Sequence, residues 1–126
     1  MKFKMWLGVA AVALLSACGA PDAPERPGKQ GAATVDIDQG RELYSNNCSS
    51  CHGLMMNGTR KGPPLNHKIY EPGHHGDQAF YRAVKKGARA HHWNFGDMPP
   101  LPQVATGEVA HIIAYVRDRQ RKSGIH

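Results

Sequence analysis

Apolar residues recur at helical spacing in the last part of the chain. One stretch has apolar residues at positions i, i+3, i+4 and i+7, namely Val109, Ile112, Ile113 and Val116. This spacing places side chains on one face of an α-helix. Thr106 precedes the stripe as a candidate N-terminal cap, and basic residues gather at the other end, where the helix dipole favours positive charge. The pattern predicts a helix capped by Thr106 that ends before Gly124.

Two shorter segments predict further helices. The first begins near Asp36 or Asp38, since either carboxylate can cap it, and then carries Gly40, Leu43 and Tyr44. The second has Asp77 as its cap and ends with two lysines before Gly87, because glycine closes helices readily. Its apolar stripe is formed by Ala79, Phe80, Ala83 and Val84. No stretch alternates as a strand would, so the predicted fold class is all-α with three main helices.

Two long loops are predicted between these helices. Residues 53–76 and 87–105 are rich in proline and glycine. Loops of this length are unusual in a compact domain. A domain of about ninety residues with few large apolar side chains also has a thin core. Both features would be explained if the loops pack on a large apolar group that is not protein.

The N-terminal segment predicts export and lipid attachment. Lys2 and Lys4 precede an apolar run, Leu7 to Leu15, that is too short to span a membrane. The following Leu15-Ser16-Ala17-Cys18 resembles the lipobox of bacterial lipoproteins, in which the cysteine is acylated; an ordinary signal peptide with an incidental cysteine is the alternative. We therefore predict a signal peptide over 1–17, a lipid-anchored flexible linker over 18–33 and a folded domain over 34–126.

The most specific motif is Cys48-Ser49-Ser50-Cys51-His52. Two thiols at this spacing can form thioether bonds to the vinyl groups of a haem, and the adjacent histidine can ligate the iron. A thioredoxin-like dithiol would need neighbouring strands, and a zinc site would need further ligands. The motif in an exported chain favours one covalent haem c. If Cys18 carries lipid, no cysteine is left over.

Met98 is the candidate for the second axial ligand. It precedes Pro99 and Pro100, whose fixed φ angles would hold a weak thioether donor in place. Met55 and Met56 follow His52 too closely to reach the opposite face of the haem easily. A lone methionine is often core filler, but Met98 lies on no apolar helical stripe.

These motifs together resemble the class I, mitochondrial-type c-type cytochromes in their bacterial single-haem form, over roughly residues 36–120. The similar segments are Gly40-x-x-Leu43-Tyr44-x-x-x-Cys48, Gly62-Pro63-Pro64-Leu65, Met98-Pro99-Pro100 and Ile112-Ile113-Ala114-Tyr115-Val116. The resemblance implies a small cytochrome c fold whose first and last helices cross at a glycine, so that Gly40 meets Ile112 or Tyr115. It also implies that the Pro63 carbonyl accepts the imidazole Nδ1–H of His52 and fixes the ring.

Five histidines in the two loops have no place in this pattern: His67, His74, His75, His91 and His92. They are interpreted as solvated residues or as donors to the haem propionates, a role that Trp93 or a neighbouring histidine could fill. A second hypothesis is a metal site, with copper as the occupant and the thioethers of Met55 and Met56 nearby. A third is a histidine in place of Met98 as iron ligand.

The predicted function is one-electron transfer between a donor and an acceptor protein of a respiratory chain, not enzymatic catalysis. The net charge of +6 falls to near +4 without Lys2 and Lys4, an excess that favours an acidic redox partner. No nucleic-acid motif is present. The expected location is the periplasmic face of a bacterial membrane, and Gly19 after Cys18 favours the outer membrane. An open-iron enzyme or sensor for peroxide or nitric oxide, and a copper-handling protein, are the alternatives.

Overall fold

A computed structural model describes residues 34–126. The predicted signal peptide, Cys18 and the linker lie outside the described residues. The described part contains α1 (Ile37–Asn47), α2 (Ser49–His52), the short 3-10 helix η1 (Lys68–Tyr70), α3 (Asp77–Lys86) and α4 (Thr106–Lys122). Its only strand-like pairing is an isolated antiparallel bridge between Ala88 and Met98. The predicted all-α class is therefore confirmed, whereas α2 and η1 were not predicted. None of the described helices is long and apolar enough to cross a membrane.

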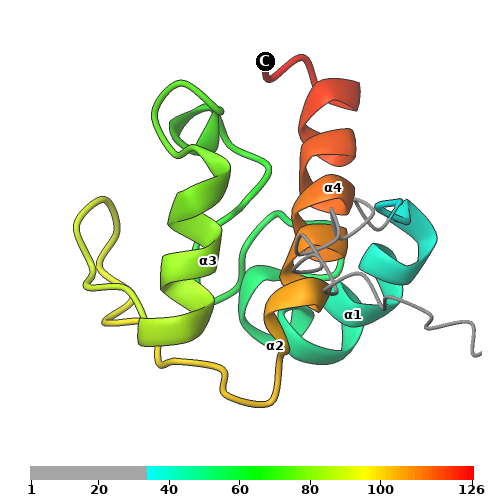
Figure 1. Cartoon of the computed structure of the whole chain (residues 1–126). Coiled ribbons are helices and arrows are strands. Elements are labelled where there is room, and N and C mark those ends of the chain that lie inside the picture. The colour runs from blue at the N-terminus through cyan, green and yellow to red at the C-terminus, as the bar shows by residue number, and fades with distance from the viewer. Residues whose placement is uncertain (1–33) are drawn as a thin grey trace, which may run out of the picture. The chain divides into compact units, whose positions relative to one another are not determined.

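Helices α1 and α4 cross at Gly40. Figure 1 shows α1 running across the N-terminal half of α4, with α3 on the left of α4. A Cβ added at Gly40 would collide with the carbonyl of His111 and lie 3.1 Å from Tyr115 Cβ. The predicted crossing is confirmed with Tyr115, while the closest approach is to His111, one residue before Ile112.

The core lies along the inner face of α4. Val109, Ile112, Ile113 and Val116 are all buried, as their spacing predicted. Tyr44 of α1 is fully buried against them, and its ring meets that of Tyr115 edge-on with centroids 5.6 Å apart. The Tyr44 hydroxyl donates to the carbonyl of Gly53 at 2.8 Å. Tyr44 thereby fixes the chain just after α2 relative to the helix crossing.

Asp36, and not Asp38, caps α1. Its Oδ1 accepts the backbone N–H groups of Asp38 and Gln39 at 2.8 and 3.1 Å. Its own backbone N–H donates to His111 Nδ1 at 2.9 Å, which attaches the start of α1 to α4. Asp38 lies in the first turn and pairs with Arg41 at the surface.

Asp36→Ala should therefore lower the free energy of unfolding by about 1 kcal/mol, the usual cost of a lost cap. Asp38→Ala is the matched control and should cost no more than a few tenths of a kcal/mol, because its ion pair is exposed. Guanidinium unfolding of the haem-loaded variants measures both. Equal costs for the two variants would contradict the assignment of the cap.

The other two predicted caps are wrong by one residue. Gly76 is the N-cap of α3, and Asp77 is its first residue. The Asp77 carboxylate is bound by Arg117 of α4 and so does not cap. Ala105 is the N-cap of α4, and its backbone N–H donates to Glu108 Oε2 at 2.8 Å. Thr106 is thus the first residue of α4, and Glu108 supplies the side-chain half of a capping box.

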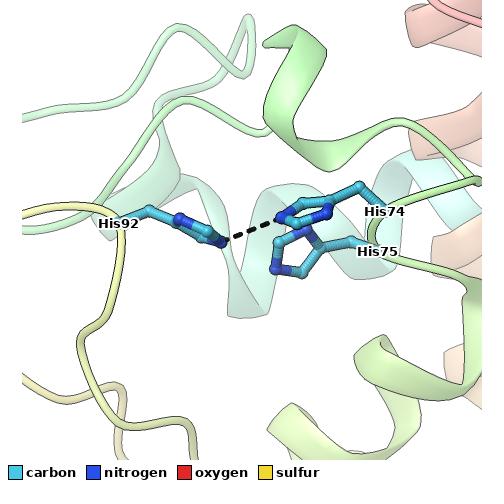
Figure 2. A group of neighbouring side chains, drawn as sticks. All are labelled: His74, His75 and His92. Carbon is cyan, nitrogen blue, oxygen red and sulfur yellow. Dashed lines mark hydrogen bonds between the residues drawn. The ribbon is translucent and has the colours of Figure 1, made fainter.

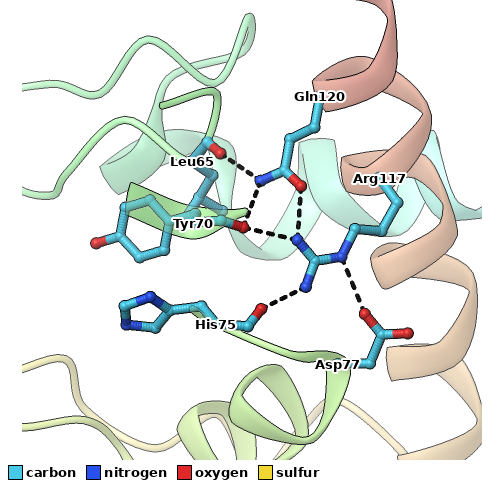
Figure 3. A network of polar contacts seen from close by, with 6 residues as sticks. All are labelled: Leu65, Tyr70, His75, Asp77, Arg117 and Gln120. Carbon is cyan, nitrogen blue, oxygen red and sulfur yellow. Dashed lines mark hydrogen bonds and ion pairs between the residues drawn. The ribbon is translucent and has the colours of Figure 1, made fainter. Parts of the chain in front are cut away.

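Two residues of α4 hold the first long loop (Figure 3). Arg117 donates through Nε to Asp77 at 2.9 Å, through Nη1 to the Tyr70 carbonyl at 2.7 Å, and through Nη2 to the His75 carbonyl. Gln120 donates to the Leu65 carbonyl at 2.8 Å. Both side chains are buried. Polar side chains therefore tie the loop from Leu65 to the start of α3 to helix α4.

Candidate functional site

A cavity of about 740 Å³ opens between the helices and the two long loops. Its walls are mostly apolar and come from α3, α4 and the loops, including Leu65, Phe80, Val84, Val109 and Ile112. Cys48, Cys51, His52 and Met98 also line it. The four side chains singled out by the sequence thus border one cavity, although Met98 is far from the others along the chain.

The two cysteines are held by a single helical turn. Cys48 is the N-cap of α2, and its carbonyl accepts the N–H groups of Cys51 and His52 at 3.2 and 2.9 Å. Both thiols are free, and burial, together with the nearby Cys51, raises the pKa of Cys48 to about 11. A dithiol oxidoreductase needs the opposite shift, because thiolate is the nucleophile. In the described part of the chain, no third histidine, cysteine or carboxylate joins this pair as a metal site.

His52 presents a neutral ring to the cavity. Its Nδ1 lies 2.9 Å from the Pro63 carbonyl oxygen. A carbonyl can only accept, so Nδ1 carries the proton and Nε2 keeps its lone pair. Burial lowers the pKa of His52, and the Pro63 carbonyl partly opposes this shift. An oriented, neutral imidazole with a free Nε2 is suited to bind a metal such as iron.

Met98 is fixed by its backbone as well as by its prolines. Its N–H donates to the Ala88 carbonyl at 2.8 Å, and its carbonyl accepts the Ala88 N–H at 3.0 Å. Gly87 precedes this bridge with φ +77°, and a Cβ there would collide with the Met98 carbonyl. Met55 is 55 % exposed and Met56 is fully buried in the core, and neither lines the cavity. Met98 is therefore the methionine that borders the site.

Trp93 places an unsatisfied donor at the cavity. Its indole Nε1 is buried and has no hydrogen-bond partner among the described residues. Burial raises the pKa of Tyr70 and the nearby Trp93 indole partly opposes this rise, but the two side chains do not meet the geometry of a hydrogen bond. A buried, unpaired N–H is costly. An acceptor carried by a bound group, such as a haem propionate, would satisfy it.

The residues present therefore fit a haem. The cavity offers two thiols at the right spacing, an oriented imidazole, a thioether, apolar walls and a donor for a carboxylate.

The loop histidines separate into two groups. His67 caps η1 and packs against Trp93, with ring centroids 5.1 Å apart. His74, His75, His91 and His92 gather at the rim of the cavity. The sequence singled out all five histidines but did not predict that His67 lies apart from the other four. It also missed Arg117 and Gln120, because basic and polar residues late in an amphipathic helix are usually solvated.

Comparison with known proteins gives two findings. The family model described as Cytochrome c matches residues 37–120 of the chain. A protein from Bacillus subtilis (strain 168), named cytochrome c-551, is 39 % identical over 62 residues. That match covers 48 % of this chain and 54 % of the relative, so the chain spans about half the length of that relative.

Proposed function

The chain belongs to the cytochrome c family, and on that premise we propose that it is a membrane-tethered carrier of single electrons between redox proteins. Its cofactor is haem c, which supplies a reversible one-electron change at iron when bound. The observation that carries the proposal is that one cavity is lined by the side chains of Cys48, Cys51, His52 and Met98.

Each of these residues has a proposed task at the haem. Cys48 and Cys51 would hold it through thioether bonds. His52 Nε2 would bind the iron, with its ring oriented by the Pro63 carbonyl, and the Met98 sulfur would be the second protein ligand. Two protein ligands on the iron would leave no open site for a substrate, which favours electron transfer over catalysis.

Five basic residues, three of which border the cavity, are proposed to receive an acidic partner. They are Lys68, Arg82, Lys85, Lys86 and Arg89, and all five are exposed. Arg82, Lys86 and Arg89 border the cavity itself. Positive charge around a haem edge would steer an acidic redox protein toward it and would support a brief encounter.

The tether is proposed from the sequence alone. Acylation of Cys18 would anchor the exported chain at the periplasmic face of a membrane, and Gly19 favours the outer membrane. Residues 19–33, rich in proline and glycine, would act as the spacer.

Replacement of Met98 tests the proposed function. The oxidised wild-type protein should show the weak absorption band at about 695 nm that reports sulfur on iron, and Met98→Ala should abolish this band. The reduction potential should fall by a few tenths of a volt, well within the roughly 0.8 V that axial ligands span. Optical spectra and potentiometry measure both effects.

Met55→Ala is the matched control, because Met55 is an exposed methionine away from the cavity. It should leave band and potential unchanged. A wild-type protein with a high-spin spectrum that binds carbon monoxide readily at neutral pH would contradict the proposal and favour an open-iron enzyme or sensor.

A further inference from the structure

Four histidines from two loops converge at the rim of the cavity. His74 and His75 come from the loop before α3, and His91 and His92 from the loop after it. One ring nitrogen from each of His74, His75 and His92 lies within 4.8 Å of the other two, a group that does not include His91. Figure 2 shows His74 and His92 reaching toward each other with His75 beside them. His91 approaches His75, with 3.4 Å between their Nε2 atoms.

Two of these rings have fixed protons. His75 Nδ1 lies 2.7 Å from the Ile69 carbonyl oxygen, and His91 Nδ1 lies 2.7 Å from the Arg89 carbonyl oxygen. Carbonyls only accept, so both Nδ1 atoms carry protons and both Nε2 atoms of the neutral rings carry lone pairs. When both rings are neutral, the two Nε2 lone pairs face each other at 3.4 Å, so either a proton or a metal ion must lie between them for the contact to be attractive.

Two of the nitrogen–nitrogen distances match those between ligands of one metal ion. The Nε2 atoms of His74 and His92 are 3.3 Å apart, and those of His75 and His91 are 3.4 Å apart. Tetrahedral ligands at about 2.0–2.1 Å from a metal are themselves about 3.3–3.4 Å apart. The carbonyl bonds to His75 and His91 are also those that commonly orient metal-binding histidines.

We propose that His74, His75 and His92 bind one late first-row divalent metal ion, Cu²⁺ or Zn²⁺, at the rim of the haem cavity, with His91 beside His75 as the nearest further imidazole. The ligands are all imidazole nitrogens, a set that suits both ions. Met55 and Met56 take no part, because neither lines this cavity and Met56 is buried in the core. This site goes beyond electron transfer and does not depend on Met98 ligating the iron.

The test uses the haem-loaded protein after treatment with a chelator. It is titrated separately with Cu²⁺ and with Zn²⁺ by calorimetry and equilibrium dialysis. We expect one ion per chain, displacement of Zn²⁺ by Cu²⁺ in keeping with their order of affinity, and nitrogen hyperfine structure in the Cu²⁺ spectrum by electron paramagnetic resonance.

Substitutions then assign the ligands. His75→Gln and His92→Gln should each weaken binding by at least about 10–100-fold, the loss typical even of outer-shell partners. His126→Gln is the matched control, since His126 is an exposed histidine at the far end of the chain. It should bind the ion as the wild type does.

Two results would overturn the site. One is the absence of stoichiometric binding by the wild type, above all if the metal-free histidine variants also shift the haem spectrum or potential, since the histidines would then serve the haem. The other is equal affinity in the wild type and in the His75→Gln, His92→Gln double variant. Visible spectra of the metal-free variants show whether the haem site is intact, so a failed fold is recognised.

Discussion

Gly40→Ala should lower the free energy of unfolding by about 3 kcal/mol, at the upper end of the cost of overpacking. The added methyl group would collide with the carbonyl of His111 and press on Tyr115 Cβ, 3.1 Å away. The obstacle is mainly backbone, which cannot rotate aside as a side chain can. Helices α1 and α4 would have to separate at their crossing, and the fully buried Tyr44 would lose part of its packing.

Gly107→Ala is the matched control for this prediction. Gly107 also lies in a helix, α4, but a Cβ built there has no neighbour within 4 Å. This variant should gain stability, by about 0.4–1 kcal/mol, because alanine restricts the unfolded chain and favours helix. Guanidinium unfolding of the haem-loaded proteins measures the two changes, which should have opposite signs. A Gly40→Ala protein as stable as the wild type would show that the helices do not cross there.

Arg117→Met should also lower the free energy of unfolding by about 3 kcal/mol. Methionine fills a similar space but donates no hydrogen bonds, so the His75 carbonyl and the Gln120 side-chain oxygen lose the donor that Arg117 supplies. The guanidinium also lies 5.0 Å from the centre of the Phe80 ring, a contact that methionine would replace only in part. The loop before α3 should loosen, and its backbone amides should exchange hydrogen faster than in the wild type.

Two milder variants separate the causes of this loss. Asp77 is 58 % exposed, so Asp77→Asn should cost less than about 1 kcal/mol even though it removes the charge of the ion pair. Arg121→Met removes an exposed arginine that lies 3.9 Å from Asp118 and should have little effect. If Asp77→Asn were as damaging as Arg117→Met, the ion pair, and not the bonds to the loop, would carry the stability.

The sequence was sufficient where a structure is decided by neighbours along the chain. The stripe from Val109 to Val116 predicted α4 because helix periodicity is local. Helix starts were less predictable, since a capping side chain can be claimed by a distant partner. Asp77 had the right position for a cap, but Arg117, forty residues later, binds its carboxylate. Nothing near Asp77 in the sequence indicates that contact.

The candidate site shows the same contrast between features set by neighbouring residues and features set by distant contacts. The sequence singled out Cys48, Cys51 and His52 because one short motif holds them together, and Met98 because two prolines follow it; all four line one cavity. The unpaired indole of Trp93 could not be foreseen, since its burial depends on both long loops. The five histidines looked equivalent in the sequence. Only the folded loops separate His67 from the four at the rim and turn the Nε2 atoms of His75 and His91 toward each other.

The bridge between Ala88 and Met98 has a consequence for how this protein can change over evolutionary time. Its two hydrogen bonds close residues 89–97 into a loop whose base is fixed independently of its tip. The entropic cost of closing a loop rises only slowly with its length. Insertions, deletions and new side chains at the tip should therefore leave Met98 in register. His91 and His92 lie on this segment. Histidines there can therefore be gained or lost during evolution while Met98 keeps its position.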